Sequence, residues 1–182
     1  ASCASAAWCR RMLRRLVAQR AKTAREGVRI AGDLLNQFGY TSSGRSLIIA
    51  DPNEAWALGI ARGKHWIAQR CPDDGVVLLP NIHIIGPEAD LDDTENVIAS
   101  PDLVDYAVER GWYDPAAGKP FSFKDVYGIP PRENSFRGKY GVDPRQWYAQ
   151  GIVKGKPIDL GNTDSLHFSV RPKQKMTVLS VA

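Results

Sequence analysis

Apolar residues recur at steps of three and four between Ala24 and Phe38. This spacing places one apolar stripe along a helix. Thr23 and Glu26 form a capping box at its start, and Gly39 suits the position just after its end. The pattern therefore predicts a helix bounded by Thr23 and Gly39. A further helical turn or two is indicated by an apolar group before it: Met12, Leu13, Leu16 and Val17.

Four short runs rich in β-forming residues follow the helix, and the segments between them are rich in turn-forming residues. Short connections favour antiparallel hairpins, because a parallel pair of strands needs a long crossover. The centre of the chain is therefore predicted to be an antiparallel meander. Residues 47–49 and 76–79 are continuously apolar, which predicts strands covered on both faces. The four runs are residues 46–50, 54–60, 65–69 and 76–85, the last interrupted by Pro80.

The second half of the chain has weaker patterns. Residues 90–96 are acidic but lack the spacing of a calcium loop, so cap and turn chemistry is the better interpretation. Residues 101–110 are predicted to form a short helix with Ser100 as N-cap and Gly111 as its stop. Residues 111–155 predict a long ordered loop region with aromatic anchors. These aromatics are Trp112, Tyr113, Phe121, Phe123, Tyr127, Trp147 and Tyr148.

Charge is unevenly distributed along the 182 residues, whose net charge is +4. Residues 1–30 hold eight of the 24 basic and one of the 20 acidic residues, so the remainder is mildly acidic. A solvated basic head is a better interpretation than a nucleic-acid arm, a membrane-surface arm or part of a transit peptide. The domain boundary is expected within this basic region: residues 1–13 form a divergent head that is disordered or helical, and one domain spans 14–182. No apolar run is long enough for a membrane span, and a soluble, cytoplasmic protein is favoured.

Three cysteines, Cys3, Cys9 and Cys71, form no metal-binding spacing. Their odd number argues against a disulfide scaffold. Cys71 ends a predicted strand and is expected to be a structural thiol. The sequence predicts no metal and no cofactor.

Several motifs together resemble those of the dipeptidase A and secernin family of cysteine peptidases. They occur in one order over roughly residues 14–178, which makes chance a poor explanation although each motif alone is weak. The segments that carry the resemblance are residues 20–26, 40–44, 49–56, 66–70, 90–93, 111–115, 118–123 and 168–178.

The resemblance implies an α+β fold, namely part of the αββα sandwich of N-terminal-nucleophile hydrolases. It also implies a dipeptide or small amide as substrate and an N-terminal cysteine as nucleophile, whose own α-amino group acts as base. No part of residues 1–182 corresponds to that cysteine strand. Removal of Ala1 and Ser2 would expose Cys3 as an N-terminal thiol, but Cys3 and Cys9 lie in a head that reads as helix or disorder, so an incidental thiol is the better interpretation. The expectation is a fragment that is inactive alone.

Asn81 is the one catalytic residue that the resemblance carries over to this chain. Relatives place an asparagine after the corresponding apolar strand, where its side chain helps to hold the oxyanion. An asparagine that caps a turn is the alternative.

Two further positions bear on the site. Gly59 stands where many relatives have a glutamate, which puts contacts there in doubt. His65 and His83 are predicted to lie on strands as satisfied, partly buried histidines.

Three other functions stay open. They are an amidase of the same superfamily, a non-catalytic secernin-like scaffold and, ranked last, a basic nucleic-acid-binding module.

Overall fold

The computed structural model describes residues 4–161 and 166–176, with side chains from residue 12 onward. The chain forms two compact units. One contains residues 1–70 and 81–129, and the other contains residues 71–80 and 130–182. Cys3 and the side chain of Cys9 lie outside the described residues.

Helices α1 (Ala4–Arg20) and α2 (Ala24–Phe38) begin the first unit. The amide of Glu26 donates to Oγ1 of Thr23 at 3.1 Å, and the Glu26 carboxylate accepts from the amide of Lys22 at 2.7 Å. Gly39 has a φ of 69°, and its amide donates to the carbonyl of Leu35. The predicted start and end of the helix are therefore confirmed, because local capping chemistry fixes both.

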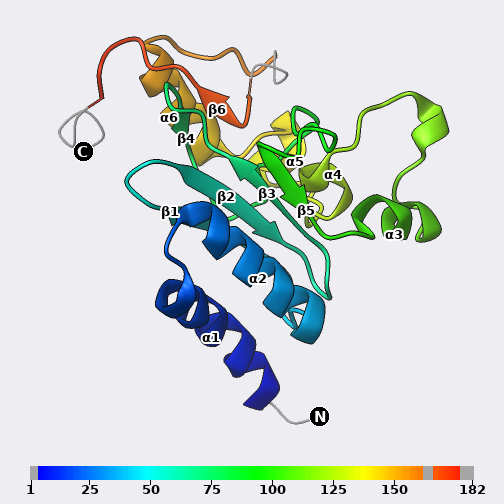
Figure 1. The fold of residues 1–182 in the computed structure, drawn as a ribbon. Helices are drawn as coiled ribbons and strands as arrows, with labels where there is room; N and C mark the ends of the chain where they lie inside the picture. Colours follow the sequence, from blue (N-terminus) through cyan, green and yellow to red (C-terminus); the bar gives the residue numbers. More distant parts are fainter. Residues whose placement is uncertain (1–3, 162–165, 177–182) are drawn as a thin grey trace. The chain divides into compact units, whose positions relative to one another are not determined.

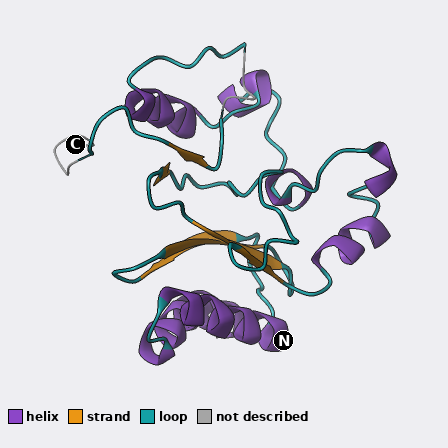
Figure 2. Cartoon of the chain, turned by 45° about the horizontal axis from the view of Figure 1, so that its top comes forward, coloured by secondary structure: helices purple, strands orange, loops and turns teal. Residues whose placement is uncertain are grey.

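A four-stranded antiparallel sheet lies against these helices in the order β1-β2-β3-β5 (Figure 1). Its strands are β1 (Arg45–Ala50), β2 (Ala55–Ile60), β3 (Trp66–Arg70) and β5 (Val97–Ala99). The first three form the predicted meander with an unbroken register. Figure 2 shows α1 and α2 side by side in one layer on one face of this sheet.

The fourth predicted strand is wrong in length and in place. Only β4 (Val76–Val77) is extended, and it pairs with β6 (Ser169–Val170) in the second unit. Pro80 lacks an amide proton, which ends any longer ladder there. β5 occupies the sheet edge beside β3 instead.

Burial of the strands also differs from the prediction. Residues 76–79 are half-buried, and β1 is an edge strand in which the Ile48 side chain is 46% exposed. β2 is the strand covered on both faces, with Trp56 and Leu58 fully buried. An apolar run therefore did not identify the central strand, because coverage depends on the order of strands in the sheet.

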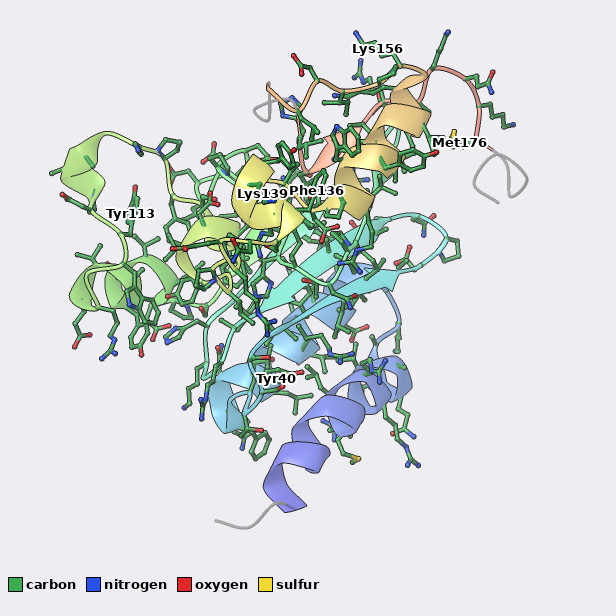
Figure 3. All side chains as sticks on the ribbon, turned by 180° about the vertical axis from the view of Figure 1, so that it is seen from behind. Tyr40, Tyr113, Phe136, Lys139, Lys156 and Met176 are labelled. Atoms are coloured by element: carbon green, nitrogen blue, oxygen red, sulfur yellow. The ribbon has the colours of Figure 1, made fainter. Side chains whose placement is uncertain are left out.

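The core of the first unit lies between the helices and the sheet. Gly32 permits close packing of α2, since a Cβ there would lie 2.2 Å from the Trp66 ring. Tyr40, labelled in Figure 3, follows α2. Two backbone hydrogen bonds bridge Tyr40 to Gly63. The buried members of this core are Leu13, Val17, Ala24, Val28, Ala31, Leu35, Tyr40, Trp56, Leu58, Ile60, Trp66 and Ala68.

The acidic turn and the helix after it are close to their predictions. Asp90 accepts from the amide of Asp92, and Asp93 accepts from that of Asn96, so turn chemistry is confirmed. Helix α3 (Leu103–Glu109) starts later than predicted. The N-cap prediction for Ser100 is wrong, because its buried hydroxyl accepts from the amide of Trp66 on β3.

Residues 111–155 contain more helix than predicted. They include the 3-10 helix η1 (Pro115–Ala117), α4 (Phe123–Val126), α5 (Phe136–Tyr140) and α6 (Pro144–Lys154). Asp143 caps α6 by accepting from the amides of Arg145 and Gln146, and Pro144 opens the helix. This N-cap followed by proline is a helix-start signal that the aromatic composition of the region obscured.

The second unit has a small core of its own, made by Val142, Ile158 and Leu166. Trp147 of α6 packs against it and donates from Nε1 to the carbonyl of Ile158 at 2.7 Å. Phe136 of α5, labelled in Figure 3, also packs against this core.

Candidate functional site

Asn81 lies in a bend, and its side chain is exposed. The segment that carries it is held beside the first strand of the sheet. Oγ of Ser46 on β1 donates to the carbonyl of Ile82 at 3.3 Å. The Asn81 side-chain amide is therefore accessible to a bound molecule, next to a backbone segment that Ser46 anchors.

His83 lies next to the same hydroxyl. Its Nδ1 is 3.4 Å from Oγ of Ser46. A hydroxyl has one proton, so when Ser46 donates to Ile82 it accepts from a protonated Nδ1 of His83. In that arrangement the serine orients the imidazole and is not itself activated as a nucleophile.

The prediction that His83 lies on a strand is wrong, because residues 82–85 have no regular structure. Ser46 and His83 are 37 positions apart in the chain. Sequence reasoning missed this pair because nothing local links the two residues.

The ring of Phe123 covers Gly59 on the same face of the sheet. A Cβ at Gly59 would lie 2.8 Å from Cε1 of Phe123 and 3.6 Å from Nδ1 of His83. Phe123 is fully buried and meets the His83 ring edge to face, with centroids 4.8 Å apart. A glutamate at position 59 would therefore displace this ring, so the glycine and the phenylalanine form a matched pair.

The prediction for His65 is also wrong, because this residue precedes β3, is buried rather than partly buried, and has an Nδ1 with no hydrogen-bond partner among the described residues. His65 belongs to a separate aromatic cluster. Its ring stacks on Tyr106 with centroids 4.0 Å apart, and Nδ1 lies 3.4 Å from the Asp102 carboxylate without hydrogen-bond geometry. Tyr127 donates from its hydroxyl to the carbonyl of Leu103 at 2.7 Å. Burial, followed by the nearby Asp102 and Tyr106, raises the pKa of Tyr127, so this phenol stays protonated. The Tyr127 hydroxyl therefore serves a backbone contact, and the His65 ring contributes to this cluster by stacking.

Residues 49–56, one of the segments that carry the family resemblance, also have a structural role. Oδ2 of Asp51 accepts from the amide of Ala24 at 2.6 Å, which ties the β1–β2 turn to the start of α2. Oδ1 of Asp51 accepts from the amides of Asn53 and Glu54. These three backbone amides lower the pKa of Asp51 because they favour the charged carboxylate.

Ion pairs surround the other end of this turn. Glu54 lies 3.8 Å from Nε of Arg25 and 3.4 Å from Nε of Arg70. The Arg25 guanidinium also lies over the Trp56 ring, 5.0 Å from its centroid. The turn therefore joins the helix layer to the sheet and does not present a reactive group.

Cys71 is half-buried and belongs to the second unit. Among the described residues, no group of three His, Cys, Asp or Glu side chains is placed to hold a metal ion. Across the same part of the chain, no helix is both long and apolar enough to cross a membrane.

The structure as described is an α+β fold, which confirms the predicted class. Residues 9–182 match the model of Peptidase family C69, and the chain belongs to this family of peptidases. The family has a fold of the N-terminal-nucleophile type, and the predicted family is thereby confirmed.

Curated relatives agree with this assignment. A dipeptidase of Bifidobacterium longum is 33% identical over 171 residues, covering 86% of this chain and 31% of its own length. A probable dipeptidase of Salmonella dublin is 36% identical over 107 residues, covering 59% and 24%. A probable dipeptidase of Latilactobacillus sakei is 26% identical over 159 residues, covering 87% and 32%. The chain thus spans about a quarter to a third of the length of these relatives.

Proposed function

We propose that residues 1–182 are part of a cysteine dipeptidase and supply the scaffold and one oxyanion-stabilising group of its active site. The observation that carries this proposal is the family match over residues 9–182, together with relatives that are named dipeptidases. The substrate is a dipeptide, and the nucleophile is an N-terminal cysteine contributed by a segment with no counterpart in residues 1–182.

The reaction begins with transfer of the thiol proton to the α-amino group of the cysteine, whose ordinary pKa of about 7.7 to 8.0 suits neutral pH. The thiolate attacks the scissile carbonyl and forms a tetrahedral intermediate. The peptide C–N bond then breaks, and the leaving amine takes the proton. Water hydrolyses the resulting thioester, which releases the acid product and restores the thiol.

Asn81 is assigned the task of donating from its side-chain amide to the oxyanion of the tetrahedral intermediate. The anchoring of Ile82 by Ser46, which restrains the backbone next to Asn81, supports this assignment. Charge develops on the oxygen only as the thiolate adds, so this donor lowers the barrier more than it strengthens substrate binding.

The test compares two forms of the protein. One is the 182-residue chain, and the other is the polypeptide encoded when the adjoining in-frame codons are included. A panel of dipeptides and N-acyl amino acids is incubated with each, and products are followed by mass spectrometry. We expect the longer form to hydrolyse dipeptides, to be inactivated by iodoacetamide, and the 182-residue chain to be inactive. Hydrolysis of N-acyl amino acids alone would make the protein an amidase, and no hydrolysis would favour a scaffold.

Asn81→Ala in the active form tests the assigned residue. We expect kcat to fall by about 100- to 1000-fold while KM changes little. Asn53→Ala is the matched control, because Asn53 is exposed and donates to Asp51 from its backbone amide, which the substitution keeps. Equal kcat values for the two variants would remove Asn81 from the active site.

A further inference from the structure

Helix α1 packs beside α2 at the β1 side of the sheet. Val17 of α1 and Ile49 of β1 both approach Gly27 of α2, where a Cβ would lie 3.3 and 2.9 Å from their side chains. Beyond this meeting point, α1 and β1 are separated by a groove of about 420 Å³. Its apolar lining includes Leu13, Val17, Leu47 and Ile49. The helix layer thus extends past the last strand of the sheet.

β1 ends the sheet, and within the described part of the chain no strand pairs with its outer edge. The amide of Asp51 donates to the carbonyl of Glu54, which makes these two residues a hydrogen-bonded pair. From that pair, hydrogen-bonded and non-hydrogen-bonded residue pairs alternate along the β1–β2 hairpin. The residues of β1 whose backbone groups point outward are therefore Ser46, Ile48 and Ala50.

An open edge with an apolar groove beside it has the form that accepts an added β-strand. Backbone groups of the incoming strand would pair with the three outward residues. Its alternate side chains would enter the groove between α1 and β1, since side chains of a strand alternate between the two faces.

A second copy of this chain does not fit the groove. Antiparallel pairing of β1 with its own copy places both helix layers on the same face of the joined sheet. Each α1 would then extend over the other strand, although strands are spaced about 4.8 Å apart and a helix is about 10 Å wide. The two copies would also bring like charges together, since Arg14 of α1 and Lys22, just after α1, line the groove.

We propose that the groove between α1 and β1 binds an extended β-strand from another part of a C69 polypeptide, with apolar residues at alternate positions and an acidic residue near Arg14 or Lys22. The relatives offer ample sequence for this strand, because this chain spans only 31% of the Bifidobacterium longum dipeptidase. The proposal concerns assembly of the fold and does not depend on which amide the assembled protein hydrolyses.

The probe is a set of labelled, overlapping 12-residue peptides from the Bifidobacterium longum dipeptidase outside the region that matches this chain. Binding to the 182-residue chain is measured by fluorescence anisotropy. We expect binding by one contiguous segment with the stated pattern. Ile48→Pro should weaken it at least about tenfold, because proline removes one outward amide. Ile48→Thr is the matched control, since it keeps that amide, and it should bind within about twofold.

Amide exchange followed by NMR gives a second readout that needs no variant to fold. The bound peptide should slow exchange at the outward-facing Ser46, Ile48 and Ala50. Leu47 and Ile49 already face β2, so their exchange should not change. No binding peptide, equal binding by the Ile48→Pro variant, or slowing confined to other residues would overturn the proposal. A dimer of the chain that Ile48→Pro dissociates would overturn it too, by making a second copy the occupant.

Discussion

The two faces of the four-stranded sheet are built from different kinds of residue. The helix face holds large apolar side chains that alternate along the strands, including Trp56, Leu58, Ile60 and Trp66. The opposite face has small residues on the same central strand, Ala57 and Gly59, and polar or exposed residues on β1. One face is therefore a filled core, whereas the other leaves room for rings and loops.

The two faces therefore have different structural roles. On the helix face, close packing fixes the position of α2 against the strands. On the opposite face, Gly59 admits the Phe123 ring, and Ser46 holds the segment that carries Asn81. The candidate site lies on the face that has small residues, because only there can other groups approach the backbone of the sheet.

Trp56→Ala should have the largest effect on stability. Trp56 is fully buried in the helix-face core, so its removal leaves a cavity and costs about 3–5 kcal/mol of unfolding free energy. Urea unfolding followed by circular dichroism measures the loss. The control is Ile48→Thr, at an exposed position on the opposite face, which should change the free energy of unfolding by less than about 0.5 kcal/mol. Similar losses in the two variants would contradict the comparison of the faces.

Gly59→Ala tests the opposite face by overfilling it. The added methyl group meets Cε1 of Phe123 at 2.8 Å, and the buried ring has little space to move, so a loss of about 1–3 kcal/mol is expected. The double variant with Phe123→Leu should lose less than the sum of the two single variants. Simple additivity in the same urea experiment would show that the ring does not fill this site.

Ser46→Ala should have a smaller effect, about 0.5–1.5 kcal/mol, because it removes hydrogen bonds of a partly buried hydroxyl. The ring nitrogens of His83, followed by NMR, should show an altered Nδ1 signal. Ser43→Ala, at an exposed serine in the preceding loop, is the control. An unchanged His83 spectrum in the Ser46 variant would separate the serine from the imidazole.

Asp51→Asn should have the smallest effect and is the change whose outcome depends on pH. Because folding lowers the pKa of Asp51, its carboxylate stabilises the folded chain above its unfolded pKa of about 3.9. That contribution is lost as pH falls through the lower folded value. The urea midpoints of the two proteins should therefore converge as the pH falls below about 4. A constant difference between pH 3 and pH 7 would contradict this mechanism.

Local chemistry explains which elements were predictable from sequence. Thr23, Glu26 and Gly39 fixed α2 because capping acts within one turn of the helix. The turns between the first three strands fixed the meander for the same reason. The α6 start at Asp143 and Pro144 was equally local but was overlooked among the aromatic residues around it.

The site was only partly predictable. Asn81 came from the resemblance to a family, and its role in catalysis remains a prediction. The contacts of Ser46 with His83 and of Gly59 with Phe123 join residues far apart in the chain. No periodicity or motif encodes such pairs, because they depend on the order in which strands and loops come together.

The sequence by itself determined the family, the α+β class, the capped helix α2 and the antiparallel meander, because these follow from motif order and from interactions between near neighbours. Tertiary structure decided that β5 lies beside β3, that β4 pairs with β6, and that β1 is an open edge with a groove between it and α1. Those outcomes depend on which backbone groups form hydrogen bonds, and which apolar surfaces pack together, between residues that are far apart in the chain. The local pattern of residues does not specify these contacts.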